Sequence, residues 1–162
     1  MYNIDHLLEL WDDIRARVPN AYLWLLGQAS RRVLDRCAGR EDIIVFGRIP
    51  KNHVLNHVAN FDLALYPRTE DQGVQAAKVA EYMGAGVPTV SYDFRVTEVL
   101  REHSAGVLVR TQSEFVAAVE RLSSDPSRLR TLSERARSAG QELDWDTLAL
   151  RYEREVFDAY LV

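Results

Sequence analysis

The stretch DLALYPRTEDQGVQAAKVAEYMGAGVPTVSY, residues 62–92, decides the fold. It predicts a strand (63–66), a polar loop (67–73), a helix (74–84) and a second strand (88–92). The apolar residues of the helix recur at helical spacing, and glycine and proline separate the helix from the second strand. A strand, a helix and a strand in this order form one right-handed unit of a parallel sheet. Because ligands of open parallel sheets bind beyond the carboxyl ends of the strands, we expect the site near the loop.

The rest of the chain alternates helices with short apolar runs. The further strands are predicted at 21–27, 43–47 and 105–109, and the further helices at 4–18, 28–38, 95–102, 113–123, 126–139 and 144–160, with a small helix or turn at 50–59. The strand at 21–27 is apolar enough to be covered on both faces, and we expect the strand at 43–47 to be buried as well. Five buried strands with helical connections predict an α/β fold with a doubly wound parallel sheet. We expect a single domain over 1–162, in which helices dominate from about residue 113.

Composition excludes several classes of protein. A chain of 162 residues is large enough for one domain with its own core. Its net charge of −4 gives no electrostatic reason to expect nucleic acid binding. The single cysteine, Cys37, excludes an internal disulfide, and a reduced cytoplasm is the default compartment. No apolar run approaches the roughly 20 residues of a membrane helix, and no Cys and His set has metal spacing.

Five pieces of the chain match one family in order and spacing. They are RVPNAYLWLLG (17–27), IIVFGRIPKNHVLNHVANFDLALYP (43–67), KVAEYMGAGVPTVSYD (78–93), AGVLV (105–109) and LDWDTLALRYEREVFDAY (143–160). In these pieces the chain resembles the carboxyl-terminal, nucleotide-sugar-binding half of GT-B glycosyltransferases, most of all the retaining enzymes of glycosyltransferase family 4. The resemblance implies a Rossmann-like sheet. It also implies sugar transfer, with retained configuration, from a UDP-, GDP- or ADP-sugar to a glycan or a lipid-linked acceptor.

The resemblance assigns roles to the acidic residues of the central unit. Glu81 matches the second glutamate of the family's paired-glutamate motif, which binds the ribose hydroxyls of the nucleotide. An ionised carboxylate can accept hydrogen bonds from two vicinal hydroxyls. The first glutamate of the motif should stand at Gly73, which is a departure from the family pattern. Glu70 and Asp71 lie close by and are candidates for contact with the transferred sugar.

The start of the central helix is the candidate diphosphate site. The amides of Gly73, Val74 and Gln75 would open this helix, where exposed N–H groups and the helix dipole favour an anion. Lys78 precedes Glu81 by three residues, so both can share one side of the helix. We hypothesise that Lys78 faces the phosphate or the sugar hydroxyls of the donor, and a surface ion pair with Glu81 is an equally weighted alternative.

Arg48 and Ile49 fall in the loop that corresponds to the family's base-binding loop. In the family, backbone groups of this loop read the edge of the base, and an apolar side chain packs on its face. An ordinary strand-to-helix turn is the alternative. No metal or other cofactor is expected for this fold, and no residue is assigned a catalytic role.

The resemblance also implies missing parts. The family's domain begins with a strand ending in Gly-Arg and a lysine that grips the diphosphate, whereas this chain starts at the helix that follows. The acceptor-binding domain is absent as well. We therefore expect a fragment without turnover, with a gap in its sheet that invites a homodimer or a strand-swapped assembly. The full-length parent would be cytoplasmic, or peripheral at the inner membrane face, and would meet a membrane only through a lipid-linked acceptor.

Two other classes of function stay open from the sequence. A nucleotide-sugar 2-epimerase has the same overall architecture and would also need the absent half. A non-catalytic α/β scaffolding module is the more distant alternative. A receiver-like module needs clustered acids at the end of its first strand, and YLWLLGQ (22–28) offers none.

Overall fold

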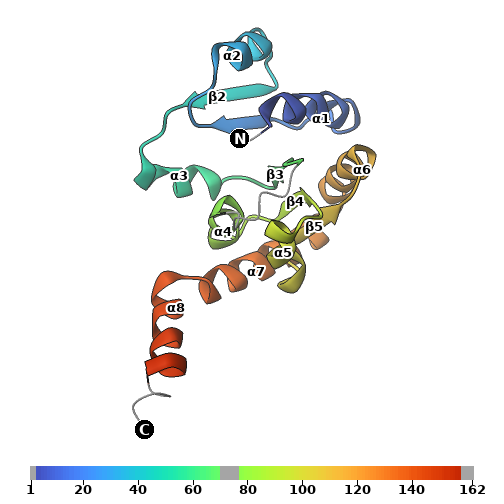
Figure 1. Cartoon of the computed structure of the whole chain (residues 1–162). Helices are drawn as coiled ribbons and strands as arrows, with labels where there is room; N and C mark the ends of the chain where they lie inside the picture. Colours follow the sequence, from blue (N-terminus) through green and yellow to red (C-terminus); the bar gives the residue numbers. More distant parts are fainter. Residues whose placement is uncertain (1–2, 70–76, 158–162) are drawn as a thin grey trace.

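The computed structural model describes residues 3–69 and 77–157, and it contains two parallel sheets. The first sheet pairs β1 (Leu23–Leu26) with β2 (Ile43–Gly47), and the second has the order β3 (Ala64–Tyr66), β4 (Thr89–Tyr92) and β5 (Gly106–Val109). All pairings are parallel, as the alternation of helices and strands predicted. Figure 1 shows the β1–β2 pair at the top of the molecule and the three-stranded sheet below it.

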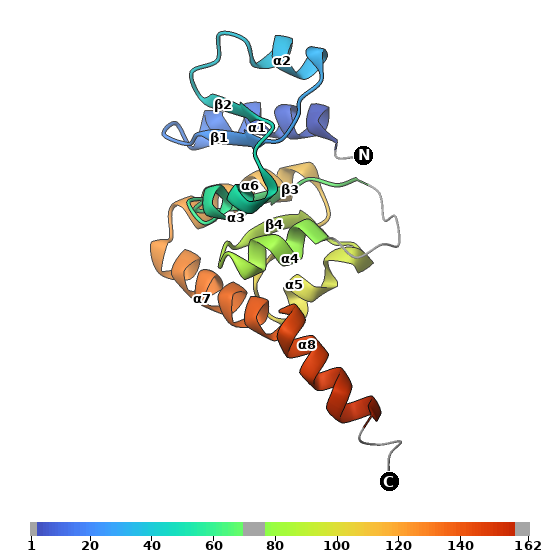
Figure 2. The same cartoon turned by 90° about the vertical axis from the view of Figure 1, so that its left-hand side faces the viewer.

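A helix lies between each strand and the next. The helices and helical turns of the described residues are α1 (Ile4–Arg17), α2 (Arg31–Cys37), α3 (Lys51–Val58), α4 (Ala77–Gly84), the 3-10 turn η1 (Arg95–Thr97), α5 (Glu98–Glu102), α6 (Gln112–Ser123), α7 (Pro126–Glu142), α8 (Trp145–Tyr152) and the π-helical turn η2 (Glu153–Phe157). Each predicted helix has a counterpart, although α7 runs three residues beyond its predicted end and the predicted start of the central helix lies outside the described residues. In Figure 2, α8 projects away from the rest of the molecule.

The sheet is broken between β1 and β3. Among the described residues no hydrogen bonding pairs these two strands, which therefore belong to separate sheets. The order β2-β1, gap, β3-β4-β5 places the break at the centre of a doubly wound arrangement. This is the gap that the family resemblance predicted.

The β1–β2 pair is well covered on one face and only partly covered on the other, where the ring of Phe46 meets His57 of α3. Leu23 and Ile43 pack against α1 and α2, but Ile44 and Phe46 on the other face are 39% and 36% exposed. The expectation that β2 is a buried strand is therefore wrong for half of its side chains. An apolar run does not reveal whether helices cover both faces of a sheet or one, because the sequence pattern of the strand is the same.

Asp42, just before β2, joins α1 and the loop after α2 to this small sheet. Its carboxylate accepts hydrogen bonds from the guanidinium of Arg40, at 2.7 and 3.1 Å, and from Nε1 of Trp11 on α1, at 2.7 Å. These bonds favour the ionised form, and the Arg40 bond is the largest cause. Together they lower the pKa of Asp42 from 3.8 to about 2.

We expect Asp42→Asn to lower the free energy of unfolding by about 2 kcal/mol at pH 7, since each unit of pKa shift corresponds to about 1.4 kcal/mol. Because the folded-state pKa lies below the unfolded one, this stabilisation is complete above about pH 4. It is lost as the pH falls towards 2. Urea unfolding between pH 7 and pH 2 measures it. The difference between parent and variant should shrink with acid, and equal stability at pH 7 would refute the role of this network.

Helix α7 crosses α4 at unusually close range. A Cβ atom at Gly140 of α7 would lie 2.6 Å from Cα of Gly84 and 2.7 Å from the carbonyl oxygen of Met83. Val79, Met83 and Ala136 form the core beside this crossing, each with 0% exposure. The contact between the two helices therefore fixes where the outer face of α4 points.

Candidate functional site

A cavity of about 1680 Å³ lies between the two sheets. At one end its lining comes from the segments that follow β1, β2 and β3 and from the first turns of α4. These residues are Gly27, Gln28, Ile49, Pro67, Arg68, Thr69, Lys78, Glu81 and Tyr82. The position agrees with the general rule that parallel sheets bind ligands beyond the carboxyl ends of their strands.

Lys78 and Glu81 form an ion pair on the wall of this cavity. Nζ of Lys78 donates to Oε2 of Glu81 at 2.6 Å, and the two side chains are 38% and 36% exposed, so a ligand can reach both. A carboxylate offers about four acceptor positions, so Glu81 keeps capacity for hydroxyl groups while paired with Lys78. Both interpretations of Lys78 thus describe part of the structure, since it pairs with Glu81 and also faces the cavity.

The buried face of α4 holds this pair in place. Val79 and Met83 are fully buried against the core beside α7, and Lys78 and Glu81 stand on another side of the same helix. Glu81 is neither turned away from the cavity nor covered by packed side chains. Glu81 is therefore accessible from the cavity, and its contact with a ribose stays a prediction.

Only some of the other predicted site residues line the cavity. Ile49 is half-buried and lines the cavity, whereas Arg48 is exposed and is not part of the lining. Five candidates lie outside the described residues, namely Glu70, Asp71, Gly73, Val74 and Gln75. Their roles stay predictions.

Arg68 is a cavity residue that sequence reasoning did not single out. It follows β3, is half-buried, and its Nη1 donates to the hydroxyl of Tyr66 at 3.3 Å. Its planar guanidinium suits a phosphate group, so the cavity wall carries two cations with Lys78. The sequence analysis placed the site near the loop 67–73, which follows a predicted strand and contains Arg68. It did not name this residue.

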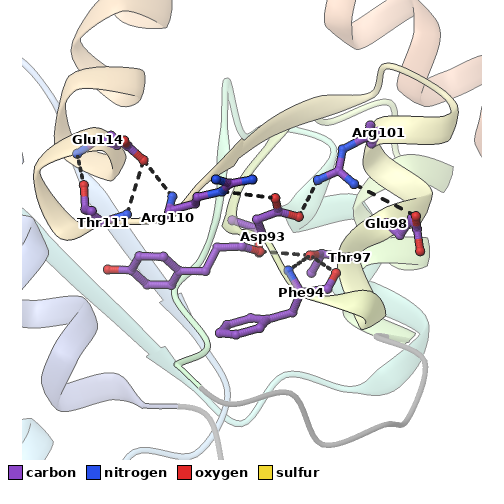
Figure 3. A network of polar contacts seen from close by, with 10 residues as sticks. Asp93, Phe94, Thr97, Glu98, Arg101, Arg110, Thr111 and Glu114 are labelled. Carbon is purple, nitrogen blue, oxygen red and sulfur yellow. Dashed lines mark hydrogen bonds and ion pairs between the residues drawn. The ribbon is translucent and has the colours of Figure 1, made fainter.

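A separate polar network fixes the segment after β4 (Figure 3). Asp93 forms ion pairs with Arg101 and, at 3.8 Å, with Arg110, while Oγ1 of Thr97 donates to the carbonyl oxygen of Tyr92 at 2.9 Å. None of these residues belongs to the lining of the cavity. We assign them a structural role at the ends of β4 and β5.

Within residues 3–69 and 77–157, no group of three or more His, Cys, Asp or Glu side chains could hold a metal ion. The expectation of a site without metal stays a prediction. Among the described helices, none combines the length and the apolar character of a bilayer span.

Proteins of known structure share the fold of this chain. Solved structures with the same arrangement include WaaG, a glycosyltransferase of lipopolysaccharide biosynthesis, with 17% identity and a TM-score of 0.74 over 88% of this chain and 40% of that one. HepE of Anabaena, solved with UDP, has 17% identity and a TM-score of 0.75 over 92% and 44%. Sucrose-phosphate synthase of Thermosynechococcus elongatus has 19% identity and a TM-score of 0.74 over 93% and 42%. These likenesses show the GT-B fold.

The family model "Glycosyl transferases group 1" matches residues 1–125, and the chain belongs to this family. The resemblance found in the sequence is thereby confirmed. The chain spans less than half the length of the solved structures that it matches. No curated protein sequence matches it.

Proposed function

We propose that the chain is the domain of a retaining glycosyltransferase that binds the nucleotide-diphosphate-sugar donor. The observation that carries the proposal is the Lys78–Glu81 pair on the wall of the cavity at the carboxyl ends of the strands. The GT-B glycosyltransferase fold and the family membership support it, and so does the UDP found in a structure of similar fold.

In this proposal each wall of the cavity meets one part of the donor. Glu81 accepts hydrogen bonds from the ribose hydroxyls, and Ile49 packs on the base. Lys78 and Arg68 neutralise the diphosphate, with help from the amides at the start of the central helix. Stabilising the departing diphosphate electrostatically is the main catalytic task of such a site.

An acceptor-binding domain is the partner that this function requires. We propose that the acceptor is a glycan or a lipid-linked glycan, and that the chain alone binds donor nucleotide without turnover. A homodimer or strand-swapped assembly is a further proposal, which light scattering over a range of concentrations tests.

We expect Glu81→Ala to weaken nucleotide binding by about tenfold, because a hydrogen bond to a charged group contributes about 1.5 kcal/mol or more. Calorimetric titration of the chain with UDP, GDP and ADP measures the effect. Glu102→Ala, on an exposed glutamate of α5 outside the cavity lining, is the matched control and should bind as the parent does.

Lys78→Ala separates the two interpretations of the ion pair. A weaker affinity would place Lys78 at the donor, and an unchanged affinity would leave it a surface partner of Glu81. If no nucleotide binds to the parent chain, the domain is a degenerate or scaffolding module and the proposed function is wrong.

A further inference from the structure

Helix α7 lies on the outside of the molecule and exposes its positive charge. Figure 2 shows α7 below α4 and α6, with its length along the outer edge. Its inward side is set by the buried residues Leu132, Ala136 and Ala139. The four arginines of the helix are all exposed, namely Arg128, Arg130, Arg135 and Arg137.

The domain itself does not neutralise these four arginines. Within residues 3–69 and 77–157, no carboxylate forms an ion pair with any of them, although Glu134 stands on the same helix. Other described arginines do form such pairs, namely Arg15, Arg17, Arg31, Arg32, Arg36, Arg40, Arg101 and Arg110. The outer side of α7 is therefore a local concentration of free positive charge on a chain whose net charge is −4.

The arginines form two rows along the helix. Arg128 and Arg135 are seven residues apart, and so are Arg130 and Arg137, so each pair lies on one line about two turns long. Between these arginine rows runs an exposed ridge of short or polar side chains, namely Ser127, Thr131, Glu134 and Ser138. Arginine has a long flexible stem, so both rows can reach a surface that lies against the ridge.

The composition of this side of α7 indicates which kind of partner it fits. The large apolar side chains that are exposed in the described part of the chain lie on other elements, so α7 offers no apolar anchor for a protein interface. None of the four arginines lines the cavity of the candidate site. A planar anionic surface can touch this outermost helix alone, whereas a polyanion that surrounds the domain would also meet its excess of acidic residues.

We propose that α7 is the surface through which the domain docks on an anionic membrane, with the two arginine rows bound to the phosphates of lipid headgroups. A guanidinium binds phosphate oxygens in pairs, which suits this contact. Because the ridge is polar, α7 stays at the level of the headgroups. This contact is distinct from one through a lipid-linked acceptor, since the domain's own surface makes it, and it does not depend on nucleotide binding.

The first test is sedimentation of the chain with lipid vesicles. We expect binding to vesicles of equimolar phosphatidylcholine and phosphatidylglycerol, and none to vesicles of phosphatidylcholine alone. Binding should weaken steeply with added salt, because the screening length falls from about 30 Å at 0.01 M to about 10 Å at 0.1 M. Failure to bind the mixed vesicles at low salt, or equal binding to both kinds of vesicle, would overturn the proposal.

The second test removes one arginine from each row. The double variant Arg130→Gln, Arg135→Gln should bind the mixed vesicles roughly 25-fold more weakly than the parent, since each arginine near an anionic surface contributes about fivefold. The matched control is Arg31→Gln, Arg32→Gln on α2, which removes the same two charges from exposed, ion-paired arginines. Figure 1 and Figure 2 both show α2 at the far end of the molecule from α7, so this control should bind nearly as the parent does.

Three further outcomes would overturn the proposal. An equal loss of binding in the two double variants, with the parent's circular dichroism, would mean that net charge and not α7 controls binding. Release from the vesicles by inorganic phosphate at constant ionic strength would mean that α7 holds a free phosphate. Binding to RNA or polyglutamate that depends on the α7 arginines, without binding to vesicles, would mean that the partner is a macromolecule.

Discussion

Replacing Gly140 with alanine is expected to lower the free energy of unfolding by about 2–3 kcal/mol, the cost of overpacking a tight contact. The new Cβ would meet backbone atoms of Gly84 and Met83 at 2.6–2.7 Å, and backbone atoms cannot rotate aside as a side chain can. In an isolated helix the same change would be stabilising by about 1 kcal/mol. The sign of the effect therefore reports the packing of α7 on α4, and urea unfolding measures it.

Gly84→Ala is the matched control on the other helix of the same contact. Its Cβ would have no heavy atom within 4 Å, so we expect the variant to be as stable as the parent or slightly more stable. Equal destabilisation by both changes would contradict the packing described here. Since α4 also carries Lys78 and Glu81, Gly140→Ala should weaken nucleotide binding as well, whereas Gly84→Ala should not.

Phe115→Ala is expected to cost about 3–5 kcal/mol, the range found when a fully buried phenylalanine is truncated. Phe115 lies on α6 with 0% exposure, and its ring centroid is 5.4 Å from that of Tyr92 on β4. It belongs to the largest apolar cluster, which joins α1, α6 and β4. Removing the ring would leave a cavity where these elements meet, and denaturant unfolding would show the loss.

Phe46→Ala tests whether this cost arises from burial. Phe46 is 36% exposed on the partly covered face of β2, where its ring centroid lies 4.9 Å from that of Trp24 and 5.4 Å from that of His57. We expect a loss of about 1 kcal/mol, because less apolar area leaves water and no closed cavity forms. A loss as large as that of Phe115→Ala would mean that another element covers this face.

The helices and strands could be predicted because each is marked by a local pattern. Periodic apolar residues indicated α1, and Asp125 with Pro126 marked the start of α7, where the Asp125 side chain accepts from the amide of Arg128 at 2.9 Å. The end of α7 was missed. A glycine after an amphipathic run usually ends a helix, whereas Gly140 lies inside α7 because α4 leaves no room there for a side chain.

Contacts between distant segments were harder to predict. No local pattern shows that β2 has a partly covered face, or that β1 and β3 fail to pair, and only the family resemblance indicated the gap. For the site, the spacing of Lys78 and Glu81 placed both on one side of a helix, as observed. The sequence indicated only the loop that contains Arg68, because whether this side chain lines the cavity depends on how the end of β3 meets it.

Helix α4 carries the Lys78–Glu81 ion pair on one side and the close contact with α7 on another. A nucleotide that binds this ion pair only in the folded chain would raise the free energy of unfolding, and the gain would grow with the ratio of ligand concentration to Kd. Thermal unfolding of the Gly140→Ala variant with and without nucleotide would therefore measure how much of the lost stability the ligand restores.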